Sequence, residues 1–283
     1  MRVSNFFKSN SSAGRPVPIF LFILNLSALG MLNGCGTLSN GRNWGQDATW
    51  NPGWARIKHA TVNAAISPET WGPVAAALVL QVDDMDGRIS DWASDNTPIF
   101  GSQNNAEKWS DYLRNTSGAA YLLTTLVTPS GKDPVEWSTA KLKGLAVGAT
   151  AWGINAGTTD LLKNQTDRTR PDKLDSRSFP SGNASSAGSF TTLSRRNISC
   201  LSLSPAYEKL SNLALYGISA GTAWARVEVK KHYPSDALVG YAIGHFFSAL
   251  INDAFLGLDT KKGPFLAIEP SRHGMIVNVT WTY

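Results

Sequence analysis

The segment KNQTDRTRPDKLDSRSFPSGN at residues 163–183 decides the fold, together with ARVEVKKHYPSD at residues 225–236. Both segments concentrate cations and turn-forming residues between stretches with helical periodicity. A phosphate monoester needs several cations or N–H donors directed at its equatorial oxygens, over which negative charge is spread in the transition state. The side chains of Lys163, Arg170 and Arg226 can supply three such cations, and each arginine can bind two oxygens in one plane.

The same segments contain groups that can complete a phosphate site. Ser181 can add a hydroxyl, and Gly182 allows close approach of the backbone, where the N–H groups of a following helix start favour anions. His232 can act as a nucleophile, because neutral imidazole attacks phosphorus readily. Asp236 can accept the other ring N–H and fix the tautomer, since Pro234-Ser-Asp is typical of a loop that enters a helix. The residues therefore predict a phosphate-binding and phosphotransfer site.

The order and spacing of these residues resemble a known family. The first part has a lysine, then six residues and Arg-Pro, and the second part has Pro-Ser-Gly. The third has an arginine, then five residues and a histidine, then three residues and an aspartate. This pattern resembles the three-part signature of the type 2 phosphatidic acid phosphatase and vanadium haloperoxidase superfamily. The resemblance implies a helical core bundle, a phosphohistidine on His232 and an orienting role for Asp236. It implies that phosphate is bound by Lys163, Arg170, Ser181, Gly182 and Arg226. It implies no cofactor and no metal, because the cationic side chains neutralise the charge.

One position departs from the family pattern. The second motif normally reads Pro-Ser-Gly-His, whereas this chain has Asn183 in place of the histidine that acts as the general acid. An amide donates hydrogen bonds but cannot transfer a proton, and general acid catalysis typically contributes about 10²–10⁴-fold. Three outcomes remain open. Most turnover is lost, or substrates are restricted to good leaving groups such as diphosphates and acidic aryl phosphates, or another acid acts, such as Asp167, Asp172 or Asp175.

Apolar residues at helical spacing predict an all-α fold, a helical bundle of the type 2 phosphatidic acid phosphatase kind. The expected helices cover residues 55–65, 71–82, 105–115, 118–127, 139–162, 210–226 and 236–255. The apolar stretches 144–159 and 237–251 are too short to span a membrane and indicate core helices. Alternation from Met275 to Tyr283 predicts a strand, which pairs with residues 265–268 in a small C-terminal β-hairpin.

The N-terminus has the pattern of a bacterial lipoprotein signal peptide. Three cations precede an apolar run at residues 18–32, which leads to Leu32-Asn-Gly-Cys35. This ending resembles a lipobox, which implies cleavage after residue 34 and attachment of lipid to the sulfur of Cys35. Gly36 follows the cysteine in place of an aspartate, which favours the outer membrane, on the periplasmic side of the cell envelope.

These features divide the chain into a signal peptide at residues 1–34, a polar, glycine-rich tether at 35–53, a helical phosphatase-like domain at 54–258 and a C-terminal hairpin at 259–283. The formal net charge of +5 falls to +2 when the three N-terminal cations are removed, since 5 − 3 = 2. The basic balance therefore does not indicate nucleic acid as a partner.

The sequence supports three hypotheses about function. The first is a phosphatase acting on a phosphorylated lipid, a small phosphoester or a diphosphate, held at the membrane through the lipid on Cys35. The second is a catalytically impaired phosphate-binding or scaffold lipoprotein, because Asn183 replaces the general acid. The third is a vanadate-dependent haloperoxidase, which uses a similar anion site, although the haloperoxidases of this family are generally much longer chains.

Overall fold

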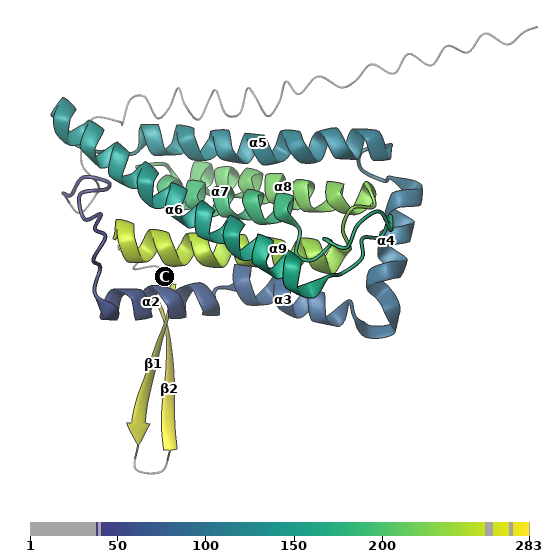
Figure 1. Cartoon of the computed structure of the whole chain (residues 1–283). Helices are drawn as coiled ribbons and strands as arrows, with labels where there is room; N and C mark the ends of the chain where they lie inside the picture. Colours follow the sequence, from purple (N-terminus) through teal and green to yellow (C-terminus); the bar gives the residue numbers. More distant parts are fainter. Residues whose placement is uncertain (1–37, 39–40, 258–262, 272–273, 283) are drawn as a thin grey trace, which may run out of the picture.

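The computed structural model describes residue 38 and residues 41–257, 263–271 and 274–282. This part of the chain is a helical bundle followed by a two-stranded hairpin (Figure 1). The α-helices are α2 (Trp54–Ile66), α3 (Pro68–Val79), α4 (Met85–Asn96), α5 (Gln103–Val127), α6 (Pro134–Thr166), α7 (Gly182–Ile198), α8 (Pro205–Glu228) and α9 (Pro234–Ile251). The remaining elements are η1 (Val82–Asp84), η2 (Asn252–Leu256), β1 (Gly263–Ser271) and β2 (Gly274–Thr282). The predicted all-α bundle is therefore confirmed.

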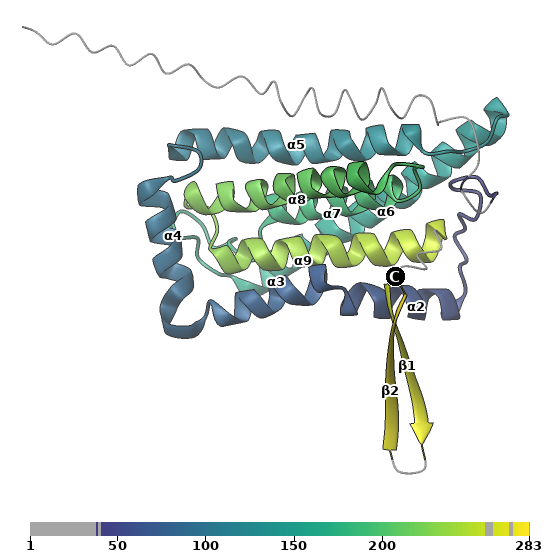
Figure 2. The same cartoon turned by 180° about the vertical axis from the view of Figure 1, so that it is seen from behind.

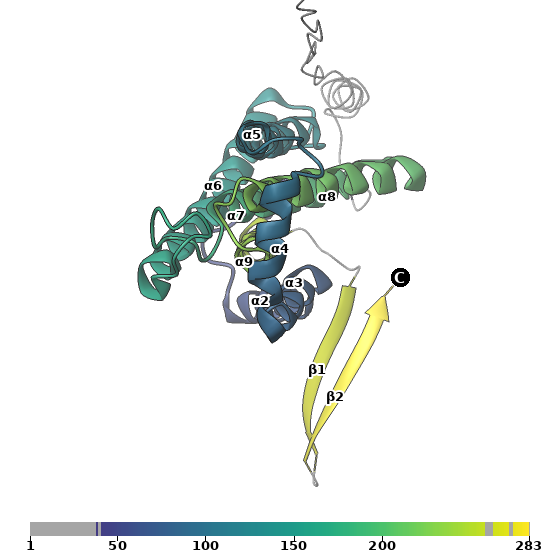
Figure 3. The same ribbon diagram turned by 90° about the vertical axis from the view of Figure 1, so that its right-hand side faces the viewer.

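Helix α9 is at the centre of the bundle. It contacts α2 and α3 on one side and α6, α7 and α8 on the other, while α5 covers α7 and α8 (Figures 1 and 2). Helix α4 crosses the end of the bundle between α3 and α5, and there it contacts α8 and α9 (Figure 3). The start of α9 is thus enclosed by helices from both halves of the sequence.

Two glycines on α9 allow α7 and α9 to approach closely. A Cβ atom at Gly244 would lie 2.1 Å from the backbone oxygen of Ser185, and one at Gly240 would lie 2.5 Å from the backbone oxygen of Ser181. At the same crossing, the backbone N–H of Ser181 donates to the backbone oxygen of Asp236 at 2.9 Å. Close helix packing therefore sets the relative positions of two of the sequence motifs.

Helix α5 is continuous where two helices were expected. The residues at the expected break, 115–118, have the sequence NTSG and are weak helix formers. In the structure Thr116 and Ser117 are buried, and the Ser117 hydroxyl donates to the backbone oxygen of Arg114 in the same helix. Packing of α5 against α7 and α8 overrides the local propensity at this point.

Part of the expected tether packs into the bundle. Trp44 is 1% exposed, although it lies within a polar, glycine-rich segment. Its backbone N–H donates to the backbone oxygen of Pro129 at 2.7 Å. Its indole belongs to a core cluster whose buried members also include Val147, Ala151, Ile251 and Leu256. The interpretation of residues 35–53 as a polar tether is therefore wrong at Trp44. Burial of this large apolar side chain fixes the segment to the bundle, although most residues around it are polar.

The two apolar stretches that were expected to form core helices lie in α6 and α9. Within the described residues, no helix combines the length and the apolar content that crossing a membrane requires. Beyond the bundle, β1 and β2 pair antiparallel, with Gly263 opposite Thr282 and Ser271 opposite Gly274.

We predict that alanine at position 244 is destabilising, because its Cβ would meet the backbone of α7. Overpacking of this kind costs about 1–3 kcal/mol, measured as the free energy of unfolding in urea. Gly157 on α6 is the matched control, since a Cβ there meets nothing within 4 Å. Gly157→Ala should be neutral or stabilising by up to about 1 kcal/mol. Equal effects of the two substitutions would contradict the close crossing of α7 and α9.

Candidate active site

The three motif segments converge where α6 ends and where α7 and α9 begin. Lys163 lies in the last turn of α6, Ser181 is the residue before α7, and Asp236 lies in the first turn of α9. The Nδ1 atom of His232 lies 2.6 Å from the backbone oxygen of Ser178, which joins the loop before α9 to the loop before α7. Segments that are distant in the sequence therefore share one corner of the bundle.

His232 is buried and neutral at physiological pH. Because a backbone carbonyl can only accept, the proton of the ring lies on Nδ1, and the lone pair lies on Nε2. The Nε2 atom has no hydrogen-bond partner among the described residues. Burial, together with the positive charges of Lys163 and Arg226, lowers the pKa of His232 to about 4, although Asp236 acts in the opposite direction. The ring therefore has the protonation state that a nucleophile needs.

Asp236 reaches His232 indirectly, which corrects the expected direct hydrogen bond. Its Oδ2 atom lies 3.8 Å from Nδ1 of His232, beyond hydrogen-bond distance. The same oxygen accepts from the Ser178 hydroxyl at 2.5 Å and from the backbone N–H of Tyr233 at 2.9 Å. Asp236 thus holds Ser178, and the backbone oxygen of Ser178 orients the imidazole. The carbonyl was missed because a backbone acceptor has no sequence signature.

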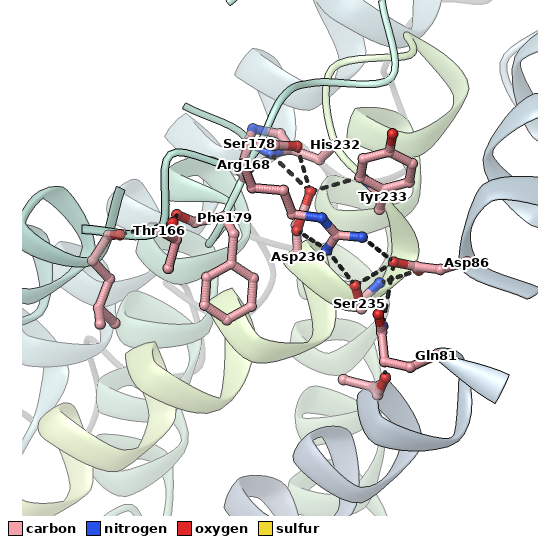
Figure 4. Close-up of polar contacts among 12 residues, drawn as sticks. Gln81, Asp86, Thr166, Arg168, Ser178, Phe179, His232, Tyr233, Ser235 and Asp236 are labelled. Carbon is pink, nitrogen blue, oxygen red and sulfur yellow. Dashed lines mark hydrogen bonds and ion pairs between the residues drawn. The ribbon is translucent and has the colours of Figure 1, made fainter. Parts of the chain in front are cut away.

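Two further charged residues were missed by the sequence analysis (Figure 4). Arg168 donates from Nη1 to Asp236 Oδ1 at 2.6 Å and from Nη2 to Asp86 Oδ2 at 2.8 Å. Arg168 lies inside the first motif segment but between its signature positions. Asp86 comes from α4, which was not expected as a helix because its sequence MDGRISDWASDN is mostly polar. A buried carboxylate on a polar helix gives no periodic signal.

The residues around the start of α7 have the properties of an anion site. The Ser181 hydroxyl is buried without a hydrogen-bond partner among the described residues. The Cε atom of Lys163 lies 3.9 Å from the position that a Cβ of Gly182 would occupy, so the lysine covers the first residue of the helix. The first N–H groups of a helix have no intrahelical acceptor and favour anions. A phosphate oxygen would satisfy both the hydroxyl and these N–H groups.

The two signature arginines contact carboxylates. Arg170 Nε lies 2.8 Å from Asp175 Oδ1, in an ion pair without hydrogen-bond alignment. Arg226 Nη1 donates to Glu107 Oε1 on α5 at 3.0 Å, while its Nε is buried without a partner among the described residues. Both guanidinium groups are therefore engaged by anionic side chains that a phosphate could replace. In the described part of the chain, no group of three or more His, Cys, Asp or Glu side chains is arranged to hold a metal ion.

Asn183 is held by α5 rather than by the other motif residues. Its Nδ2 donates to the Ser110 hydroxyl at 2.9 Å and to Asp111 Oδ1 at 3.3 Å. Its Oδ1 accepts from Arg114 Nη1 at 3.0 Å. These contacts satisfy the amide, and they bring Asp111 to the position where the family pattern has the general acid.

Two of the three acids proposed from the sequence contact cations. Asp172 accepts from Lys231 Nζ at 2.8 Å, and Asp175 pairs with Arg170. Asp167 is the residue that ends α6, with a left-handed backbone. The structure therefore directs attention to α5 as the source of carboxylates near residue 183. The sequence analysis did not single out the acidic residues of α5, because they match no motif.

Comparison with known proteins agrees with the motif analysis. Residues 144–257 match the PAP2 superfamily, and this range contains every signature residue from Lys163 to Asp236. Among solved structures, the chain is similar to the first transmembrane PAP2-type phosphatidylglycerolphosphate phosphatase from Bacillus subtilis, with 19% identity and a TM-score of 0.48. That similarity covers 66% of this chain and 95% of the other. No curated protein sequence matches this chain.

Anion affinity should depend on the protonation of Lys163. Burial, with the charges of Arg170 and Arg177, lowers the pKa of this lysine to about 8. The ammonium form is present below this pH and is lost as the pH rises through it, so affinity should fall there. Sulfate is a suitable probe for calorimetry because it stays a dianion throughout. In Lys163→Arg, sulfate affinity should no longer fall over this pH range, because arginine keeps its charge. An equal fall in affinity in both proteins would show that Lys163 does not bind the anion.

Proposed function

Because residues 144–257 belong to the PAP2 superfamily, we propose that this phosphatase-type protein hydrolyses phosphoesters or diphosphates through a phosphohistidine on His232. One observation supports the proposal above the others. A buried imidazole is kept neutral with Nδ1 fixed on a carbonyl, next to the cations of Lys163 and Arg226. This combination suits attack on phosphorus by Nε2 in an anion-binding site.

The proposed reaction has two steps. In the first, Nε2 of His232 forms a bond to phosphorus while the bond from phosphorus to the leaving oxygen breaks. In the second, water attacks the phosphohistidine, which releases inorganic phosphate and restores the imidazole. Lys163, Arg170 and Arg226, with the Ser181 hydroxyl, would bind the phosphoryl oxygens in both steps.

The leaving group decides how much the missing acid matters. Asn183 cannot protonate the leaving oxygen, because an amide has no proton that it can transfer. An alkoxide is strongly basic and needs a proton, whereas a phosphate leaving group is stable without one. We therefore propose a diphosphate or an acidic aryl phosphate as the preferred substrate, and a phosphorylated lipid as the natural class.

The contacts of Asn183 also support a second candidate function. The amide of Asn183 is fully engaged by Ser110, Asp111 and Arg114, so a catalytically impaired phosphate-binding or scaffold protein is the alternative. Such a protein would bind phosphate with the same residues but turn it over slowly.

We also propose that the protein is a lipoprotein on the periplasmic side of the bacterial envelope, attached through lipid on Cys35. The support is the sequence of residues 1–35, which lies outside the described residues. A lipid anchor would hold the site close to phosphorylated lipids and raise their effective concentration.

His232→Ala should abolish release of inorganic phosphate from a panel of alkyl phosphates, aryl phosphates and diphosphates. The reason is that no other described imidazole lies among the signature residues. His59→Ala on α2 is the matched control and should keep wild-type rates. Absence of phosphate release from every substrate by the wild-type protein, with sulfate binding intact, would favour the binding or scaffold function.

Asn183→His should raise turnover on alkyl phosphates by up to about 10²-fold and much less on diphosphates. A histidine there would lie close to Asp111, whose charge raises the pKa of an imidazole and suits a general acid. Asn183→Gln is the control, because it keeps an amide. The measurement is kcat for both substrate classes, and equal gains on the two classes would contradict the leaving-group explanation.

A further inference from the structure

Two buried carboxylates share one arginine beside the candidate nucleophile (Figure 4). The side chain of Asp86 is 4% exposed and that of Asp236 is 0% exposed, while Arg168 between them is 29% exposed. The guanidinium carbon of Arg168 also lies 4.2 Å from the centre of the Tyr233 ring, which covers one face of the cation. Arg168 therefore joins an acid from α4 to the acid at the start of α9.

Asp86 also fixes the first turn of α9. One of its oxygens accepts from the backbone N–H of Ser235 at 2.8 Å, and the other accepts from the Ser235 hydroxyl. Arg168 Nη1 donates to that hydroxyl as well, at 2.9 Å. All four carboxylate oxygens of Asp86 and Asp236 therefore accept hydrogen bonds, which is the condition under which buried charges are tolerated.

The charge on Asp236 matters because the carboxylate lies 3.8 Å from Nδ1 of His232. An uncompensated anion at this distance favours the imidazolium form, which has no lone pair on Nε2. The other charged groups that act on the ring are Lys163 from α6 and Arg226 from α8, and both oppose protonation. Arg168 is the cation in direct contact with Asp236, at 2.6 Å. Its loss would leave a buried anion close to the nucleophile.

We propose that Arg168, anchored by Asp86, is a positioning residue that neutralises Asp236 and so keeps His232 unprotonated and able to attack phosphorus. The proposal rests on the phosphatase function proposed above. It assigns a role in the reaction to α4, which lies outside the segment that matches the PAP2 superfamily. It also explains why a carboxylate so near the imidazole contacts Ser178, Tyr233 and Arg168 while the ring donates to a carbonyl.

The experiment is an NMR titration of His232 in the free protein, with its signal among the four histidines assigned by its absence in His232→Ala. In Arg168→Gln, the midpoint of the His232 titration should rise by about one pH unit. In Arg168→Lys, which keeps the charge, it should stay near the wild-type value. The acid limb of kcat/KM should move in parallel, because that limb reports ionisation of the free enzyme.

A double variant separates the electrostatic role from a structural one. Arg168→Gln alone leaves Asp86 buried without its cation, which destabilises the fold. Arg168→Gln/Asp86→Asn removes that anion and should recover the stability against urea, while the His232 midpoint stays raised because Asp236 is still uncompensated. An unchanged midpoint in the folded double variant would overturn the proposal.

The titration also distinguishes this proposal from the proposed function. A raised midpoint in a protein that releases no phosphate from any substrate would support the role of Arg168 in setting the charge state and reject the phosphatase function. An unchanged midpoint in an active enzyme would reject the role of Arg168 alone.

Discussion

The contact between the starts of α7 and α9 is the constraint on which the rest of the structure depends. The backbone hydrogen bond from Ser181 to Asp236 is possible because residue 240 has no side chain to hold the helices apart. This crossing brings together a helix N-terminus, a buried carboxylate and a hydroxyl that has no partner in the described part of the chain. Lys163 then reaches this corner from α6, and Arg226 acts on the same imidazole from α8. The arrangement of the candidate site is therefore a consequence of helix packing, not of local loop structure.

Electrostatics at this corner follow from desolvation. Burial makes charge costly, so the imidazole stays neutral and the lysine titrates well below its ordinary pKa. Burial also raises the pKa of Asp236, but hydrogen bonds and the Arg168 charge outweigh this effect and hold its pKa below the ordinary value. A neutral imidazole and an ionised carboxylate can thus lie side by side because each has a different set of partners.

The sequence predicted the helical class and the segments that meet, because signature spacing and apolar periodicity report helix faces and loop lengths. It did not predict Arg168 and Asp86, since a polar contact between distant segments leaves no periodic trace. The backbone oxygen of Ser178 was also invisible, because every residue has a carbonyl. The prediction of a polar tether failed at Trp44 for another reason. The composition of the whole segment is polar, but this one buried side chain anchors it to the bundle. Sequence reasoning therefore predicted which motif segments meet better than it predicted the groups that hold them in place.

The carboxylate of Glu107 on Arg226 has a consequence for product release in the proposed reaction. Inorganic phosphate formed at the site would compete with an anion that is tethered to α5 and cannot diffuse away. A tethered competitor acts at a high effective concentration, so Glu107 would help to displace the product without depending on the surrounding solution. In the proposed reaction, Glu107 would thus limit product inhibition by returning to Arg226 when phosphate leaves.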